Sequence, residues 1–296
     1  MANHNKISPS AWLLAKLRSE YTTIPYTKEI ANEMQEGLSP LSMRLVFKII
    51  QFIAKNRPQK FISLTTAEGR YLNVNDALPD KKKYVLIELA AGLSPRSIEK
   101  SKEGHIVIET DLPWLINFKE RVLEKIFKKD DKPDNHYLLT INVLNREELE
   151  TVGKLYHKLG KNKPLYIVHE GLMFYFTAEE KIQFRDNMKW FLSKYAPKKG
   201  HWVTTDLTPV PQREEKSSNA FKVIIKIIEK ATKRSINFST SHEETMQFLN
   251  EGGLHGEKLV NQNLENDLSI LDKVDLPRDF VIDFNRRYSA YLIRPM

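Results

Sequence analysis

The stretch Tyr84-Val85-Leu86-Ile87-Glu88-Leu89-Ala90-Ala91-Gly92 decides the fold of this chain. Its first six residues form a nearly continuous apolar run, which predicts a strand buried on both faces of a parallel sheet. The run ends in three small residues, which predict a tight turn where a ligand can lie close against the backbone. A buried strand followed by such a turn is the start of an open α/β sheet.

Similar runs recur downstream, and helical patterns separate them. Strands alternating with helices at this rhythm predict an α/β fold, with a doubly wound, mostly parallel sheet and helices on both faces. The further strands are expected at 105–109, 137–141, 165–169 and 201–205, and the helices between them at 97–101, 114–127, 146–159 and 178–195.

The two ends of the chain have different patterns. A helix is expected from Trp12, with Ser10 as its N-cap, and a second one after Ser42 that ends near Pro58. The apolar spacing over 217–234 predicts a packed helix. Two strands, at 280–284 and 288–293, are expected to form an antiparallel pair at the edge of the sheet.

Small and polar residues follow the first four predicted strands, where open parallel sheets bind their ligands. After the first strand, Gly92 predicts room for a cofactor. An acid about 20 residues further on, Glu109 or Asp111, suits both ribose hydroxyls. Polar and backbone groups after the third strand, at Asn142 and Val143, suit an adenine edge, and Glu170 follows the fourth strand. The four strand ends together predict a site for a nucleoside cofactor.

The turn itself argues against a dinucleotide. A pyrophosphate is usually held by Gly-x-Gly-x-x-Gly, whereas this turn has Gly92 alone, with Ala90 and Ser94 at the flanking positions. Glu88, which opens the turn, suits a cofactor that carries an ammonium group and no phosphate. S-adenosyl-L-methionine has both properties, so we predict it as the cofactor.

Composition narrows the classes of function. The chain of 296 residues has no cysteine, which excludes disulfides and thiolate chemistry and fits a cytoplasmic protein. No apolar run reaches about 18 residues, so no membrane span is predicted. The net charge of +8 attracts anions, but the lysines form short clusters at expected loop ends, such as 81–83, 128–129 and 198–199. We therefore predict a small-molecule substrate, no nucleic-acid or membrane partner, and no metal.

The chain resembles the leucine carboxyl methyltransferase family, in particular its bacterial branch of O-methyltransferases of polyketide biosynthesis. The stretches that carry the resemblance are Ser8-Pro9-Ser10-Ala11, Ile24-Pro25-Tyr26, ELAAGLSPRS (88–97), ETDLP (109–113) and HEGLMFYF (169–176). The resemblance implies a class I methyltransferase fold: a Rossmann-like sheet of seven strands with an antiparallel C-terminal strand. It also implies a helical lid over 1–80 and a catalytic domain over 81–296, with a helical insertion around 212–275.

The resemblance also assigns cofactor contacts by position. Gly92 and Glu88 would lie near the methionine part, Asp111 or Glu109 would hold the ribose, and an arginine before the first strand, Arg70, would pair with the cofactor's carboxylate. Asn142 and Val143 would flank the adenine, Glu170 would line the cleft, and Arg96 would close the turn. Ala90, Ser94-Pro95 and Asn142 depart from the wider family's glycine, Asp-Thr pair and aspartate. Arg18 and Lys28 are the candidates for the cation that leucine-methylating members use near their N-terminus.

The acceptor oxygen is not fixed by the sequence. A carboxylate is ionised near neutral pH and needs only to be positioned, whereas a phenol needs a base. The catalytic candidates are His169, Asp206 and Tyr175, and the lack of a compelling histidine favours a carboxylate. Two alternatives stay open: a module that binds the cofactor without turnover, and a nucleic-acid methyltransferase, for which Glu170-Gly171-Leu172-Met173 lacks the usual Pro-Pro-aromatic motif. The oligomeric state is not predicted.

Overall fold

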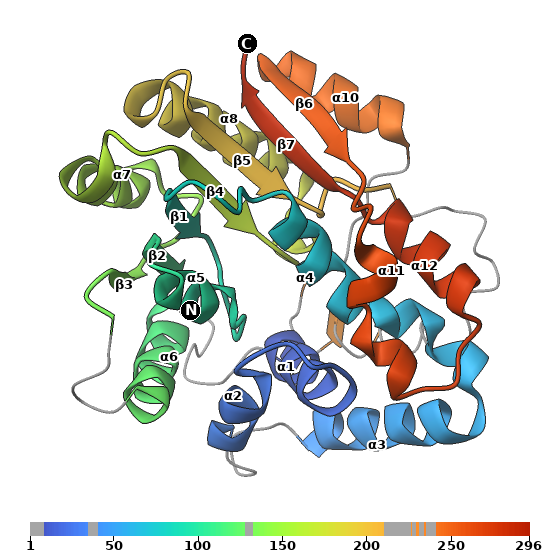
Figure 1. Ribbon diagram of the computed structural model, residues 1–296. Coiled ribbons are helices and arrows are strands. Elements are labelled where there is room, and N and C mark those ends of the chain that lie inside the picture. The colour runs from blue at the N-terminus through green and yellow to red at the C-terminus, as the bar shows by residue number, and fades with distance from the viewer. Residues whose placement is uncertain are drawn as a thin grey trace.

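A computed structural model describes residues 9–34, 41–127, 133–209, 226, 229–230, 234 and 241–296. Its centre is one seven-stranded sheet in the order β3-β2-β1-β4-β5-β7-β6. The first five strands pair in parallel, and β7 runs antiparallel to both β5 and β6 (Figure 1). The strands are β1 (Val85–Glu88), β2 (Ile106–Asp111), β3 (His136–Thr140), β4 (Leu165–His169), β5 (Gly200–Thr204), β6 (Leu254–Leu259) and β7 (Ala290–Pro295).

Helices cover both faces of the sheet, as the alternating pattern predicted. One face packs on α7, α8 and α10 through a core that includes Ile87, Ile167 and Trp202. The opposite face packs on α4 through Val74 and Leu86. These helices are α4 (Thr66–Asp76), α7 (Arg146–Gly160), α8 (Ala178–Tyr195) and α10 (His242–Glu251). Two further helices, α5 (Arg96–Lys102) and α6 (Pro113–Ile126), follow β1 and β2 in the chain.

Local sequence explains where α8 begins. The Thr177 side chain accepts a hydrogen bond from the backbone N–H of Glu180, and the Glu180 side chain accepts one from the N–H of Thr177. This capping box satisfies two of the amide groups that a helix start leaves without partners. The helix therefore starts at Ala178, as expected.

The N-terminal helices form a separate layer below the sheet in Figure 1. They share one apolar core with α6 and with the C-terminal helices, so residues far apart in the chain, such as Trp12, Phe118 and Val281, belong to the same cluster. Besides α6, the elements that contribute to this core include α1 (Pro9–Tyr21), α2 (Thr27–Glu33), α3 (Leu41–Asn56), the 3-10 helix η2 (Pro58–Thr65), α11 (Leu264–Asp267), the 3-10 helix η4 (Ser269–Asp272) and α12 (Arg278–Arg287).

The strand expected at 280–284 is wrong, because these residues lie in α12. Val281, Ile282, Phe284 and Asn285 are buried, a spacing that fits one face of a helix, and so short an apolar run does not distinguish strand from helix. The partner of β7 is β6 instead, in which Leu254 and Gly256 are buried between exposed residues. That strand lies inside the stretch expected to be a helical insertion, and the helix predicted over 217–234 falls mostly outside the described residues.

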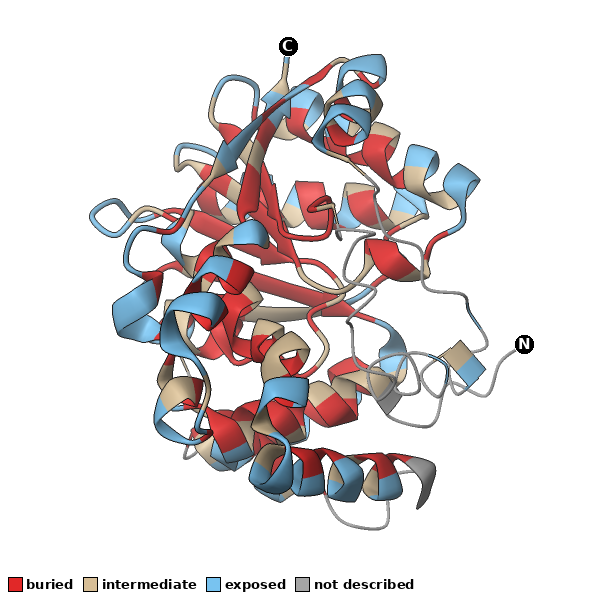
Figure 2. Cartoon of the chain, turned by 90° about the vertical axis from the view of Figure 1, so that its right-hand side faces the viewer, coloured by how far each residue is buried: buried red, intermediate tan, exposed pale blue. Residues whose placement is uncertain are grey.

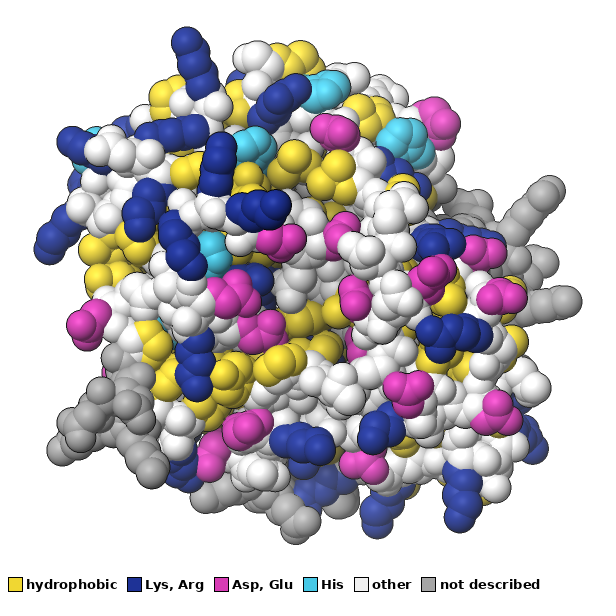
Figure 3. Space-filling view, in the orientation of Figure 1, with side chains coloured by type: hydrophobic (Ala, Val, Ile, Leu, Met, Phe, Trp, Pro, Cys, Tyr) yellow, Lys and Arg dark blue, Asp and Glu magenta, His cyan; other side chains and the backbone are white. Residues whose placement is uncertain are grey.

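Charge is distributed unevenly over the surface. Lys and Arg side chains gather over the upper left of Figure 3, where the strands begin in Figure 1. The expected loop-end lysines Lys81, Lys82, Lys83 and Lys198 are exposed, while 128–129 lie outside the described residues. No helix in the described part of the chain is long and apolar enough to cross a membrane.

Candidate functional site

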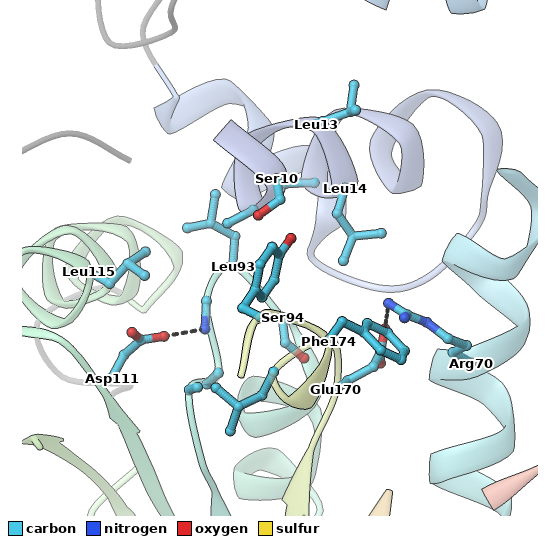
Figure 4. A pocket seen from close by; sticks show the side chains of 18 of the residues that line it. Ser10, Leu13, Leu14, Arg70, Leu93, Ser94, Asp111, Leu115, Glu170 and Phe174 are labelled. Carbon is cyan, nitrogen blue, oxygen red and sulfur yellow. Dashed lines mark hydrogen bonds and ion pairs between the residues drawn. The ribbon is translucent and has the colours of Figure 1, made fainter. Parts of the chain in front are cut away.

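The carboxyl ends of β1 to β4 surround a cavity of about 640 Å³. Its wall includes residues that follow each of these strands, together with side chains of α1, at the top of Figure 4, and of α4, at its right. Of the predicted cofactor residues, the wall contains Arg70, Glu88, Gly92, Asp111, Asn142, Val143 and Glu170. The strand ends therefore meet as the sequence predicted.

Gly92 lies in the turn after β1 with a φ of +56°, in the left-handed region that favours glycine. A Cβ atom built at this position would come no closer than 3.7 Å to any other atom, the nearest being the Cβ of Ala11. This is ordinary van der Waals contact with one small side chain, and both Ala11 and Gly92 lie on the cavity wall.

Asp111, the last residue of β2, is held in place by the turn. Its Oδ2 accepts a hydrogen bond from the Gly92 N–H at 2.7 Å, and its Oδ1 accepts one from the Leu112 N–H at 2.7 Å (Figure 4). Burial raises the pKa of Asp111 to about 6, although both backbone hydrogen bonds oppose this shift. An ionised carboxylate has about four acceptor positions, so this side chain keeps capacity for a ligand's hydroxyls.

Glu109 lies two residues deeper in the strand and is not part of the cavity wall. Its carboxylate is paired with Lys119 at 2.6 Å and with His136 at 3.0 Å, and all three side chains are buried. Lys119 and His136 lower the pKa of Glu109 despite its burial. Of the two acids predicted for the ribose, Asp111 is thus the one that faces the cavity.

Glu170, which follows β4, is surrounded by arginines from three helices. Its carboxylate contacts Arg18 of α1 at 2.5 Å, Arg96 of α5 at 3.1 Å and Arg70 of α4 at 3.4 Å. These charges lower the pKa of Glu170 to about 2 although its burial acts in the opposite direction. The structure thus brings Arg18 into the site, whereas Lys28 is exposed on α2 and outside the cavity wall.

Glu88 is a second carboxylate in this cluster, but its oxygens face the protein. Oε1 accepts a hydrogen bond from Arg96 at 2.7 Å and Oε2 one from Ser97 at 2.5 Å, and the residue is 1% exposed. Its contacts thus position Arg96 rather than leave a carboxylate free for an ammonium group.

Arg70 is the arginine of this cluster that is most open to the cavity. Its side chain is 15% exposed, against 3% for Arg18 and 0% for Arg96. Its guanidinium lies 5.5 Å from the ring of Phe174, and its Nε has no partner among the described atoms. Arg70 lines the cavity, so its positive charge lies at the cavity wall.

The adenine-side residues are partly as predicted. Val143 is buried and contributes apolar surface to the wall. Asn142 is exposed, and its Oδ1 accepts a hydrogen bond from the Leu144 N–H while its own N–H donates to Glu148. The Asn142 side chain therefore shapes the loop after β3.

His169 and Asp206 lie together but outside the cavity wall. Nδ1 of His169 is 3.1 Å from Oδ2 of Asp206, and His169 packs edge-on against the ring of Phe184 in the core below α8. Successive strand residues point to opposite faces, so His169 turns away from the cavity that Glu170 lines. Asp206 accepts hydrogen bonds from the N–H groups of residues 171, 172 and 173. These contacts engage both side chains away from the cavity wall, so the structure gives no support to either residue as a base.

Tyr175 is the catalytic candidate that does line the cavity. Burial raises the pKa of its phenol, and a hydrogen bond with Ser10 of α1 acts against the shift. The helix begins at Pro9, so Ser10 is not its N-cap, and its side chain reaches the site instead (Figure 4). The phenol therefore stays protonated at neutral pH.

Sequence reasoning missed the apolar half of the cavity wall. Leucines of α1 and residues of η2 and α6 supply it, including Leu13, Leu14, Leu17, Leu64, Trp114 and Leu115. In the sequence these residues look like the core face of ordinary helices, and no pattern marks them as cavity-lining.

Comparisons with known proteins were made at three levels. Neither a scan of protein-family models nor a search of curated proteins found a match. Among solved structures, a DUF574 family protein from Streptomyces avermitilis is similar over 97% of both chains, with 11% identity and a TM-score of 0.51. The two chains share this fold, a seven-stranded, mostly parallel sheet with an antiparallel β7, which is the sheet that the resemblance implied. An O-methyltransferase family protein from Burkholderia thailandensis has 10% identity, a TM-score of 0.47, and coverage of 97% of this chain and 72% of its own. A mitomycin 7-O-methyltransferase has 9% identity and a TM-score of 0.47, and the match covers 97% of this chain and 73% of that enzyme.

Proposed function

We propose that this protein is an S-adenosyl-L-methionine-dependent methyltransferase that methylates an oxygen of a small molecule. The observation that carries the proposal is the convergence of Gly92, Asp111 and Arg70 on one cavity. When bound, the cofactor supplies an electrophilic methyl group on a sulfonium centre. The protein's part is to bind the cofactor, orient the acceptor and exclude water.

The residues present fit this cofactor. Gly92 has no side chain to fill the space close to the backbone, and Asp111 offers acceptor positions for ribose hydroxyls. The guanidinium of Arg70, whose Nε has no partner among the described atoms, suits the amino-acid carboxylate. Val143 gives an apolar surface for the adenine, while Glu88 and Glu170 position the arginines. Because the turn has Gly92 alone in place of Gly-x-Gly-x-x-Gly, a dinucleotide is disfavoured.

The acceptor is expected to be an apolar molecule that carries a carboxylate. Among the described residues of the cavity wall there is no histidine, and burial raises the pKa of the Tyr175 phenol, so neither residue type supplies a base for a phenol. A carboxylate is already ionised and needs only to be held in line. The leucines of α1 provide an apolar wall, in agreement with the resemblance to carboxyl methyltransferases.

The test is mass spectrometry of the native protein, followed by calorimetry and a transfer assay. We expect S-adenosylmethionine or its demethylated product to co-purify, and labelled methyl to pass to apolar carboxylic acids rather than phenols. Binding without transfer to any acid or phenol would favour a cofactor-binding module. Failure to bind the cofactor at all, or capture of a dinucleotide, would refute the proposal.

A further inference from the structure

Helix α3 carries an apolar stripe on its outer side. Leu45 is 60% exposed, Ile49 42% and Phe52 60%, and these residues recur four and three positions apart, on one face of the helix. Figure 2 shows the same helix along the lower edge of the molecule, with its buried side inward and its exposed side outward. Large apolar side chains aligned in this way are more than the scattered exposure found on most surfaces.

The stripe is not left open by poor packing of the helix. The opposite face is fully engaged, since Met43, Val46 and Ile50 are at most 2% exposed and belong to the shared helical core. Phe47 also meets Trp12 of α1 edge-on, with ring centroids 6.2 Å apart. Helix α3 is thus firmly held from one side and presents a second apolar face outward.

Charge along the same segment has one sign only. From residue 37 to residue 67 the chain contains no Asp or Glu, but it contains Arg44, Lys48, Lys55, Arg57 and Lys60. At 100° per residue, Lys48, Lys55 and Arg44 all fall on one flank of the stripe centred on Leu45. An apolar face beside cations is the pattern of a helix that lies in the interface of an anionic bilayer.

We propose that α3 docks this protein on the surface of anionic membranes, with Leu45, Ile49 and Phe52 entering the acyl boundary and the flanking cations meeting lipid headgroups. Long basic side chains reach the headgroup level while their stems cover apolar surface. A second copy of the chain fits this face less well, because two such faces would bring cations together with no acid from this segment to compensate. The docking is peripheral and needs no spanning helix. It revises the expectation of no membrane partner.

Helix α3 adjoins two elements of the cavity wall. η2, which follows α3 directly, supplies Ser63 and Leu64 to the cavity wall, and α1, against which α3 packs, supplies Leu13 and Leu17. The docking proposal does not depend on the methyltransferase proposal, since it rests on α3 alone.

The test is co-sedimentation of the full chain with vesicles. Vesicles of mixed phosphatidylglycerol and phosphatidylcholine are compared with pure phosphatidylcholine, at low and high salt. We expect binding to the anionic vesicles only, weakened by salt. The double variant Leu45→Gln/Phe52→Gln should reduce binding at least about tenfold, because two large apolar side chains no longer enter the bilayer. The variant Lys48→Gln/Lys55→Gln should reduce it about fivefold or more per charge removed.

Matched controls lie elsewhere on the surface. Phe280→Gln removes a side chain that is 52% exposed on α12, and Lys258→Gln removes an exposed cation on β6. Both should bind vesicles like the unmodified protein. Equal binding of the stripe variant and its control would overturn the proposal. The proposal would also be overturned if the protein bound no vesicles. A dimer in light scattering that the Leu45→Gln/Phe52→Gln variant dissociates would then show that a second copy of the chain covers the stripe.

Discussion

Asp111 is the cavity residue whose charge changes near neutral pH. Its pKa of about 6 lies above the ordinary value of 3.8, chiefly because of burial. Cofactor affinity should therefore rise as the pH increases through about 6, since an ionised carboxylate accepts hydroxyl hydrogen bonds more strongly. Replacing Asp111 by Asn should weaken binding about 10- to 100-fold at pH 8 and remove this pH dependence, as calorimetry would show.

The effect of Asp111 on the stability of the protein has the opposite dependence on pH from its effect on cofactor affinity. A carboxyl whose pKa is raised on folding favours the folded state at low pH, so Asp111 contributes a loss of stability as the pH rises from about 4 to about 6. Asp111→Asn should flatten this part of the stability profile. Unchanged cofactor affinity in Asp111→Asn at every pH would remove Asp111 from the cofactor site. Asp272→Asn, outside this cavity, is the matched control for the charge.

Gly92 gives a prediction with an internal control. Gly92→Ala places a methyl group at a φ of +56° in contact with Ala11 at the cavity wall, where we propose that the cofactor lies. Gly104→Ala places one at a φ of +83°, next to Lys83 and away from the cavity. Both should lose about 1–2 kcal/mol of stability in denaturant titrations. Only Gly92→Ala should weaken cofactor binding, and equal affinities for both variants would contradict the assignment.

At the scale of elements, one carboxylate joins three helices to the sheet. Arg18, Arg70 and Arg96 reach Glu170 from α1, α4 and α5. The Glu170→Gln variant would leave these buried cations short of a partner, so we expect a loss of about 3–5 kcal/mol in the free energy of unfolding. Because the pKa of Glu170 is lowered to about 2, its stabilisation is present above pH 4.5 and is lost as the pH falls towards 2.

The measurement is urea unfolding at several pH values. The free energy of unfolding of Glu170→Gln should fall less on acidification than that of the unmodified protein, because this variant lacks the ion pairs that acid breaks. The Arg18→Met variant should also have a lower free energy of unfolding than the unmodified protein. Glu150, which pairs with Lys194 at 3.0 Å at the surface, is the control, and Glu150→Gln should change little. A Glu170→Gln variant as stable as the unmodified protein would show that the arginines find other partners.

Elements were predictable where burial alone determines them. The strands up to β5 are continuous apolar runs between polar turns, and their ends locate Gly92, Asp111 and Glu170. α12 was not predictable in the same way, because Phe280, Val281 and Ile282 fit either period over so short a run. Its conformation depends on tertiary contacts, among them the Asn285 side chain donating to Thr65 at 2.7 Å.

At the scale of the whole molecule, the sequence indicates which residues gather but not which way each one points. Glu109 and Asp111 are both acids at the end of one strand. Only their contacts distinguish them: Glu109 is buried and paired with Lys119, whereas Asp111 accepts a hydrogen bond from Gly92 at the cavity wall. His169 and Glu170 are neighbours, yet they face opposite sides of the sheet. The leucines of α1 form part of the cavity wall only because α1 folds back over the strand ends, a long-range contact that no local pattern encodes.

That folding back ties the N-terminal helices to the rest of the chain. Trp12 of α1 and Val281 of α12 share one core, and Arg18 is bound to Glu170 beside the sheet. The helical segment therefore should not unfold on its own as a lid. Two single-tryptophan variants test this. One keeps only Trp12 and the other keeps only Trp202 of β5, and in each variant phenylalanine replaces the other three tryptophans. We expect their fluorescence midpoints in urea to agree with each other and with each variant's circular dichroism, as for a single cooperative unit. If the Trp12 signal is lost first, the N-terminal helices are a lid that opens while the sheet stays folded.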